Sequence, residues 1–425
     1  MTEEFLHYLW KYKLIKQPLI LSAGEQCQVI NTGNHNTHAG PDFLNAHLRI
    51  DETLWVGNVE IHIQASDWYK HNHQKDSAYE NVILHIVYKE DKSVRLKNGA
   101  IVPTLELAGK FDENLLSTYE DLMNNLRWIP CEQMISGVNR FTVNNWLDRV
   151  LIERLENKSI RIGELLEHNL GDWAETFYQT LARNFGFKVN AIPFELLARS
   201  VPLKILAKHK HDRKQVEALL FGQAGLLKGG HRDGYFREMK KEYSFLAGKY
   251  GLEPIDPHLW RFLRMRPSNF PTIRLSQLSG LICKSSHLFS EILETGSVDS
   301  LLHKFEVQAS SYWNTHYTFG KTSAKREKLL GKAARQLLLI NTIIPFLFLY
   351  GRTKGIQPLI DRSLKFLDQI PGERNHVTRK WESLGLSCRT SFSTQALLQL
   401  KSEYCDSKKC LHCSIGHAIL TQKHE

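Results

Sequence analysis

The chain has 425 residues, of which 42% are hydrophobic and 24% are charged, a composition that excludes a wholly disordered, collagenous or coiled-coil protein. The 55 Lys and Arg exceed the 45 Asp and Glu, and the net charge of +10 favours a polyanionic partner without identifying it. The 7 cysteines are sparse and odd in number, which argues against a disulfide framework and predicts a reducing, cytoplasmic environment.

The chain shows no sign of membrane insertion. Its N-terminal residues, Met1 to Glu4, lack the basic and apolar regions of a signal peptide. The longest apolar run, Leu337 to Tyr350, contains polar residues and a proline and is too short to span a bilayer. We therefore expect a soluble protein with no membrane partner.

The first part of the chain carries one helical pattern followed by strand patterns. Apolar residues at three- and four-residue spacing predict a helix over about 2–15. Alternating or continuous apolar residues then predict strands at 26–31, 43–50, 54–63, 82–88 and 101–107. A polar turn at 51–53 separates the second strand from the third, and a helix is expected to begin at Ser66 or Asp67.

From about residue 112 onward the pattern is helical. Helices are predicted at 143–156, 173–185, 214–227, 235–250, 297–305 and 323–339, with Gly and Pro between them. The expected fold class is α+β in three parts. These are a mixed α/β unit over 1–111, an α-helical region over 112–370 and a small Cys-rich tail over 371–425.

Carboxylates and an imidazole gather on two neighbouring predicted strands. Asp42 precedes one strand, and Glu60 and His62 lie in the next. Because strand side chains alternate, Glu60 and His62 point to one face and Val59 and Ile61 to the other. If the strands pair around the turn, Asp42 lies at the same end of the sheet. Such a group could hold Mg²⁺ or Mn²⁺, which polarises a phosphoryl oxygen and activates water.

These residues resemble a known superfamily. Pro41-Asp42, with Glu60-Ile61-His62 eighteen positions later, is similar to the motif of the PD-(D/E)XK nucleases, and the predicted order of elements is similar to their fold. Over about the first 110 residues, the resemblance implies a restriction-endonuclease-like unit that hydrolyses phosphodiesters in DNA. It implies that Asp42 and Glu60 hold the metal and that His62, in place of the usual Lys, orients or deprotonates water. Glu3 or Glu4 would be auxiliary.

The whole chain also resembles a family of uncharacterised bacterial proteins. The features that carry this resemblance are the Gly40-Pro41-Asp42-Phe43 and Val59-Glu60-Ile61-His62 segments and the C-terminal cysteines. The family implies no activity.

A second polar group lies between the third and fourth predicted strands. His71, His73 and Asp76 offer imidazole and carboxylate ligands, which suit Zn, Mn or Fe. They would extend the first site or, with His62, hold the metal of another class of hydrolase. His85 lies in an apolar strand and is expected to be a core histidine.

The C-terminal tail carries three cysteines at close spacing. Cys405, Cys410 and Cys413 form a Cys-x4-Cys-x2-Cys pattern, in which the last two thiolates can reach one metal ion. We expect Zn²⁺ or an Fe–S cluster, with ordinary reduced thiols as the alternative. The candidates for the fourth ligand are His417, Cys388 and His412. The remaining cysteines, Cys27, Cys131 and Cys283, are expected to be packing residues.

The helical region contains a basic segment. Its side chains recur at three- and four-residue spacing and would form one stripe along a helix: Lys321, Lys325, Lys328, Lys332 and Arg335. Such a stripe suits a phosphate backbone.

The leading hypothesis is therefore a metal-dependent nuclease-like protein that binds nucleic acid, with DNA favoured. One alternative is a non-catalytic nucleic-acid-binding or scaffold protein on a degenerate nuclease-like fold. The other is a His/Asp metal-dependent hydrolase of another class.

Overall fold

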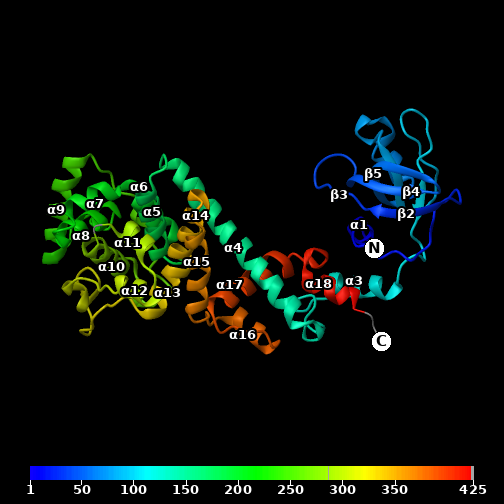
Figure 1. The fold of residues 1–425 in the computed structure, drawn as a ribbon. Helices are drawn as coiled ribbons and strands as arrows, with labels where there is room; N and C mark the ends of the chain where they lie inside the picture. The colour runs from blue at the N-terminus through cyan, green and yellow to red at the C-terminus, as the bar shows by residue number, and fades with distance from the viewer. Residues whose placement is uncertain (286, 423–425) are drawn as a thin grey trace. The chain divides into compact units, whose positions relative to one another are not determined.

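The structure is a computed structural model that describes residues 1–285 and 287–422. The chain is α+β, as its sequence predicts, and forms two compact units (Figure 1). The N-terminal unit consists of Met1–Trp146 and the described residues from Leu400 onward, and the helical unit consists of Leu147–Gln399. Both ends of the described chain therefore belong to the same unit. Whether the three parts expected from the sequence fold separately stays a prediction.

The N-terminal unit is built on a mixed sheet with strand order β1-β2-β4-β5-β6-β7, in which β3 also pairs with β4. Its strands are β1 (Leu19–Ile20), β2 (Gln26–Asn31), β3 (Asn34–His35), β4 (Phe43–Ile50), β5 (Thr53–Gln64), β6 (Val82–Lys89) and β7 (Thr104–Glu106). The pairings among β1 to β5 are antiparallel, and β5, β6 and β7 are parallel to one another. The strands predicted at 26–31 and 43–50 are confirmed with the same bounds, as β2 and β4.

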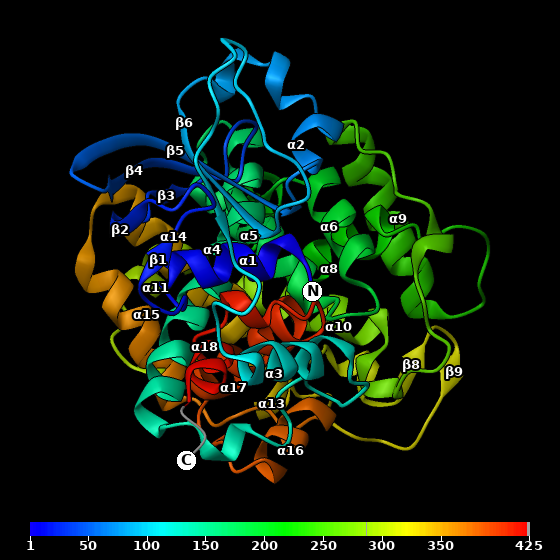
Figure 2. The ribbon, with the colours of Figure 1, turned by 90° about the vertical axis from the view of Figure 1, so that its right-hand side faces the viewer.

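One face of the sheet packs against helix α1 (Glu3–Lys11), whose first turn is capped by the Thr2 hydroxyl. The apolar side of α1 shares a core with inward-facing strand residues such as Val59 and Ile61. Helix α3 (Glu113–Asn124) and helix α18 (Ser414–Thr421) belong to the same unit and lie side by side (Figure 2). Burial of apolar surface on this face is thus shared by residues from both ends of the chain.

The other face is covered by the connector between β5 and β6. The helix predicted at Ser66 or Asp67 is a single short one, α2 (Asp67–Lys70), and Asn72 with φ +63° turns the chain after it. Trp68 and Tyr79 pack with Val82 and Val87 into a second, smaller core. Side chains that leave β5 and β6 toward this face therefore meet the connector rather than α1.

The helical unit contains a two-stranded sheet, β8 (His316–Thr318) and β9 (Lys321–Thr322), and many helices. Helix α4 (Arg140–His168) begins in the N-terminal unit and continues into this one. The other helices are α5 (Trp173–Phe185), α6 (Ala191–Ser200), α7 (Leu203–His209), α8 (Arg213–Gln223), α9 (Gly234–Tyr250), α10 (Pro271–Lys284), α11 (Leu288–Glu294), α12 (Val298–Lys304), α13 (Lys332–Leu338), α14 (Ile344–Lys354), α15 (Gln357–Gln369), α16 (His376–Ser383) and α17 (Ser391–Gln399).

The helix predicted at 323–339 is wrong over its first half, because residues 323–331 are not helical. Tertiary pairing overrides the local pattern there: Leu330 N–H donates to Val307 C=O, and Ala309 N–H donates to Lys328 C=O. The Lys328 ammonium is buried and donates to backbone carbonyl groups.

The single basic stripe therefore does not form, and only Lys332 and Arg335 of the five residues lie on helix α13. The role of these five residues in nucleic-acid binding stays a prediction.

One helical stretch, Lys332–Lys354, is long and apolar enough to cross a membrane by length and composition. It comprises α13, a π-helical turn at Leu339–Ile343, and α14. Buried residues make up 56% of its most apolar window, which is typical of a core helix in a soluble protein.

The core assignment can be tested on two leucines of the sheet. Leu84 in β6 is 0% exposed, and Leu54 in β5 is 58% exposed. Leu84→Ala should lower the free energy of unfolding by about 2–5 kcal/mol, because it leaves a cavity. Leu54→Ala should change it by less than about 0.5 kcal/mol. Chemical denaturation measures both, and equal effects would contradict this packing.

Candidate metal centre

The pairing of β4 with β5 places Asp42 next to Glu60. Phe43 at the start of β4 lies opposite Val59. The Ile61 N–H donates to Asp42 Oδ2 at 2.9 Å, and the Asp42 N–H donates to Glu60 Oε2 at 3.2 Å. Backbone groups of the two strands therefore hold both carboxylates at the same end of the sheet.

Three imidazoles converge near Glu60. His62 Nε2 lies 3.5 Å from Glu60 Oε1 and 3.1 Å from His71 Nδ1, while His73 Nε2 lies 3.2 Å from Glu60 Oε1. One ring nitrogen from each histidine lies within 4.8 Å of the other two. Two ligand atoms bound to one ion at about 2.1 Å are about 3.0–3.4 Å apart in octahedral or tetrahedral geometry. The observed spacings are close to this range.

Local structure explains the convergence. Glu60 and His62 leave β5 on the face that carries the connector, because side chains alternate along the strand. His71 follows α2 and His73 opens a short 3₁₀ turn, and the positive φ of Asn72 between them reverses the chain. The His73 ring also stacks on Tyr79 with 3.8 Å between the ring centroids. Both connector histidines are thus held against the polar side of β5.

His85 supports His62 from the next strand. His62 Nδ1 and His85 Nε2 share a hydrogen bond of 2.8 Å, and the two side chains are almost fully buried. Burial lowers the pKa of His62 to about 2 and that of His85 to about 3, so both rings are neutral near pH 7. Neutral imidazole is the form that binds metal ions, and a partner on its second nitrogen fixes its orientation.

The charges and donors of the site fit a bound cation. Burial raises the pKa of Glu60, the nearby Asp42 raises it further, and the neighbouring His73 ring opposes the shift. His73 Nε2 is buried, and the carboxylate oxygen Oε1 of Glu60 lies 3.2 Å from it. An ion coordinated beside Glu60 would stabilise its charge and take His73 Nε2 as a ligand.

Helix α1 adds side chains on the side of Asp42. His7 Nε2 lies 3.2 Å from Asp42 Oδ2. Burial raises the pKa of Glu3, and Asp42 and His7 both act on its charge, which places Glu3 within electrostatic reach of the site. Glu4 instead contacts His412, whose Nε2 lies 3.0 Å from Glu4 Oε1. His7 is not among the site residues expected from the sequence. Its four-residue spacing from Glu3, which puts both side chains on one helix face, is the feature of the sequence that indicates it.

Two residues have surroundings that differ from their expected roles. Asp76 is exposed, and its Oδ1 accepts the Ala78 N–H at 2.9 Å, so it caps a 3₁₀ turn. His62 is only 2% exposed and contacts other side chains through both ring nitrogens. These contacts favour a ligand role for His62 over direct proton transfer from water.

A separate cluster of thiols lies in the same unit. All seven cysteines are free. The pKa of Cys131 is raised to about 12 by burial and then by Cys413 and Cys410. The pKa of Cys405 is raised by burial and then by Cys131, Cys413 and Cys410. Cys131 and Cys410 also pack on one apolar core. Cys131, which the sequence analysis treats as a packing residue, therefore packs on the same core as Cys410 and lies within electrostatic reach of the tail cysteines.

The three residues that the sequence analysis offers as a fourth ligand beside the tail cysteines each contact another group. His417 Nδ1 shares a 2.8 Å hydrogen bond with the Tyr8 hydroxyl. His412 contacts Glu4, as described above. Cys388 belongs to the helical unit, where its thiol donates to the Thr378 carbonyl. The thiol cluster thus offers a donor set made entirely of sulfur.

Comparisons with known proteins give one positive result. No curated protein and no solved structure matches the chain. A family model described as "Protein of unknown function (DUF2851)" matches residues 3–376. This confirms the expected membership of an uncharacterised family, while the nuclease-like character of the N-terminal unit stays a prediction. The chain belongs to the DUF2851 family.

Proposed function

We propose that this protein is a metal-dependent hydrolase that cleaves phosphodiester bonds in DNA. Its metal centre would consist of Glu60 with His62, His71 and His73. The observation that carries the proposal is the convergence of three ring nitrogens within 4.8 Å of one another, with a Glu60 carboxylate oxygen 3.5 Å from His62 Nε2 and 3.2 Å from His73 Nε2. Imidazole-rich sites suit Mn²⁺, Fe²⁺ or Zn²⁺ better than Mg²⁺.

The surrounding residues have distinct tasks in this proposal. A bound ion polarises a phosphoryl oxygen and lowers the pKa of water. Asp42 and His7 are 23% and 19% exposed and lie beside each other, while His71 is exposed. In this proposal Asp42 and His7, on the side of the site next to helix α1, would position a water molecule and take its proton. His85 holds the His62 ring in place from the buried side.

Two observations support a phosphodiester as the substrate. If the two-residue strands β1 and β3 are set aside, the order of α1, β2, β4, β5, α2 and β6 agrees with the helix–strand–strand–strand–helix–strand order implied by the nuclease resemblance. The net charge of +10 favours a polyanion. The approach of His71 and His73 to His62 also agrees with a hydrolase of another class, which makes the substrate the point to test.

Metal binding tests the centre first. His71→Ala should weaken Mn²⁺ binding to the chelator-treated protein by about 10-fold or more, since even outer partners of metal ligands contribute about 10–100-fold. His38→Ala is the matched control, because both side chains are exposed. Electron paramagnetic resonance of free Mn²⁺ measures the binding, and thiols compete poorly for this ion. Equal affinity in the two variants would remove His71 from the centre.

Cleavage tests the reaction. Purified protein with Mn²⁺ should cleave single- or double-stranded DNA, and Glu60→Gln should reduce the rate by about 100-fold or more, because a metal-bound charge is lost. Asp76→Asn alters an exposed capping carboxylate and should cleave at the wild-type rate. A wild-type protein that binds DNA but cleaves none with Mg²⁺, Mn²⁺ or Zn²⁺ would favour the non-catalytic alternative.

We further propose that Cys131, Cys405, Cys410 and Cys413 hold a structural Zn²⁺ or an Fe–S cluster. Thiols at Zn–S distances of about 2.3 Å lie about 3.8 Å from one another in a tetrahedral site. In the described parts of the chain, the three histidines are the one set of three or more such groups with all ligand atoms within 4.8 Å. The thiols of the described residues form no such set, so metal analysis, rather than this spacing, distinguishes Zn²⁺ from an Fe–S cluster.

Elemental analysis tests the thiol centre. Cys131→Ala, purified without oxygen, should lose the Zn or the Fe and sulfide found in the wild type, because one of four ligands is missing. Cys283→Ala removes a half-buried thiol of the helical unit and should keep full metal content. Full occupancy in Cys131→Ala would exclude Cys131 as a ligand.

A further inference from the structure

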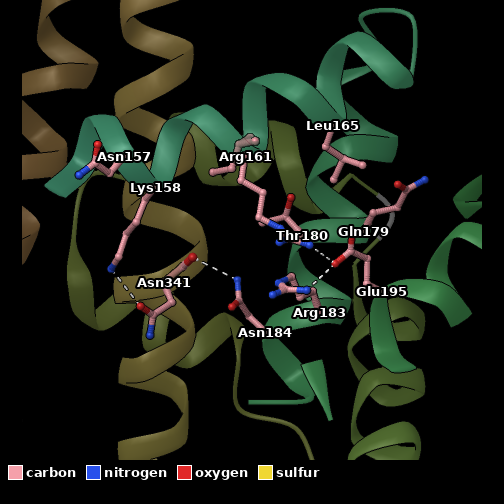
Figure 3. Close-up of a pocket in the computed structure, with 11 residues that line it drawn as sticks. Asn157, Lys158, Arg161, Leu165, Gln179, Thr180, Arg183, Asn184, Glu195 and Asn341 are labelled. Atoms are coloured by element: carbon pink, nitrogen blue, oxygen red, sulfur yellow. Dashed lines mark hydrogen bonds and ion pairs between the residues drawn. The ribbon is translucent and has the colours of Figure 1, made fainter. Parts of the chain in front are cut away.

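A cavity of about 250 Å³, to which mainly polar residues contribute, lies in the helical unit among α4, α5, α6 and the π-helical turn Leu339–Ile343. Figure 3 shows Lys158 reaching from α4 toward Asn341, and Arg161 and Arg183 meeting Glu195. Its lining residues belong to neither the metal centre nor the thiol cluster. The cavity therefore has no role in the function proposed above.

Positive charge exceeds negative charge in the lining. Glu195 is 9% exposed and forms ion pairs with Arg161, with Arg183 at 2.5 Å and with Arg199 at 2.7 Å. Burial opposes its ionisation, but the surrounding arginines hold the pKa of Glu195 below its usual value. Lys158, Arg161 and Arg183 line the cavity with Glu195 as the one carboxylate, and Arg199 lies outside the lining. The two arginines and the glutamate give the lining a net charge of +1, which becomes +2 when the Lys158 amine is protonated as well; burial lowers the pKa of Lys158 to about 7.

Lys158 is bound by neutral groups. Its Nζ donates to Asn341 Oδ1 at 3.0 Å, to Gln395 Oε1 at 2.8 Å and to the Ile340 carbonyl at 3.5 Å. Within the described ranges, no carboxylate oxygen lies within 4.0 Å of this ammonium. Burial and the neighbouring Arg154 lower the pKa of Lys158 to about 7, with Glu373 opposing the shift, and an anion in the cavity would favour the protonated ammonium.

The π-helical turn shapes one wall of the cavity. A π-helical turn breaks the regular i→i−4 ladder and frees carbonyl groups, and such turns often occur at functional sites. Here Lys158 contacts the Ile340 carbonyl, and Asn184 Nδ2 donates to the Asn341 carbonyl at 3.1 Å and to Thr342 Oγ1 at 2.9 Å. These bonds fix Lys158 and Asn341 at the cavity before any ligand is bound.

We propose that this cavity binds a phosphate monoester. Arginine presents a planar fork of donors that matches phosphate oxygens, and Arg161 and Arg183 each spend one terminal nitrogen on Glu195. Binding of a phosphate dianion would favour protonation of Lys158 beside the two arginines, and the amides of Asn184 and Asn341 lie beside the space left for the rest of the ligand. The ligand that carries this phosphate group would be inorganic phosphate, a mononucleotide or a nucleic acid with a 5′-phosphate.

Calorimetric titration of the full-length protein tests this site. The probes are inorganic phosphate, AMP, and an oligothymidylate with either a 5′-phosphate or a 5′-hydroxyl. Arg161→Gln should weaken binding of the best phosphate probe by about 10-fold or more, because a charge-assisted bond is lost. Arg161 is 55% exposed, so the variant should fold. Arg149→Gln is the control, since Arg149 lies on the same helix outside the cavity and pairs with Glu153.

The probes separate the sources of phosphate. Tighter binding of the 5′-phosphorylated oligonucleotide than of its 5′-hydroxyl form assigns the cavity to a nucleic-acid end, and preferential binding of AMP or phosphate assigns it to a small ligand. The proposal is overturned if no probe binds the wild type saturably, or if Arg161→Gln and Arg149→Gln bind the best probe equally. In either case, the arginines around Glu195 serve only to connect α4, α5 and α6.

Discussion

The alternation of side chains along β5 is the constraint on which the candidate site depends. Val59 and Ile61 enter the apolar core beneath α1, so Glu60 and His62 must leave the strand on the opposite face. A shift of one residue in the pairing with β4 would bury the carboxylate under α1 and expose the apolar residues. The hydrophobic effect that fixes the register therefore also fixes the direction of the side chains of Glu60 and His62, the two strand residues of the proposed metal centre.

The same constraint explains why the site is polar and yet largely buried. The connector brings Trp68 and Tyr79 onto the face that carries His62 and His85, and their packing removes water from both imidazoles. Neutral imidazole rings and a buried carboxylate are stable together only if each hydrogen-bond donor has an acceptor and the carboxylate has a counter-charge. A divalent ion supplies that match in our proposal, and the thiol centre is a separate element of the same unit.

The local hydrophobic pattern of the sequence predicts many of the strands and helices correctly. The strands β2 and β4 and the helix α5 have the predicted bounds, because period-two and period-3.6 patterns are strong there. The helix at 323–339 failed because extended pairing with 307–309 outweighs local preference. Residues distant in sequence escaped prediction for a related reason. Spacing shows neither that Cys131 lies within electrostatic reach of Cys410 and Cys413 nor that His7 lies beside Asp42.

Anomalous X-ray diffraction from crystals of the full-length protein grown with Mn²⁺ tests the central claim most directly. The account predicts an anomalous peak bounded by Glu60, His62, His71 and His73, at about 2.1–2.3 Å from their oxygen and nitrogen atoms. A peak that is coordinated by Asp42 and excludes the histidines, or a histidine cluster that binds no ion at saturating Mn²⁺, would contradict it.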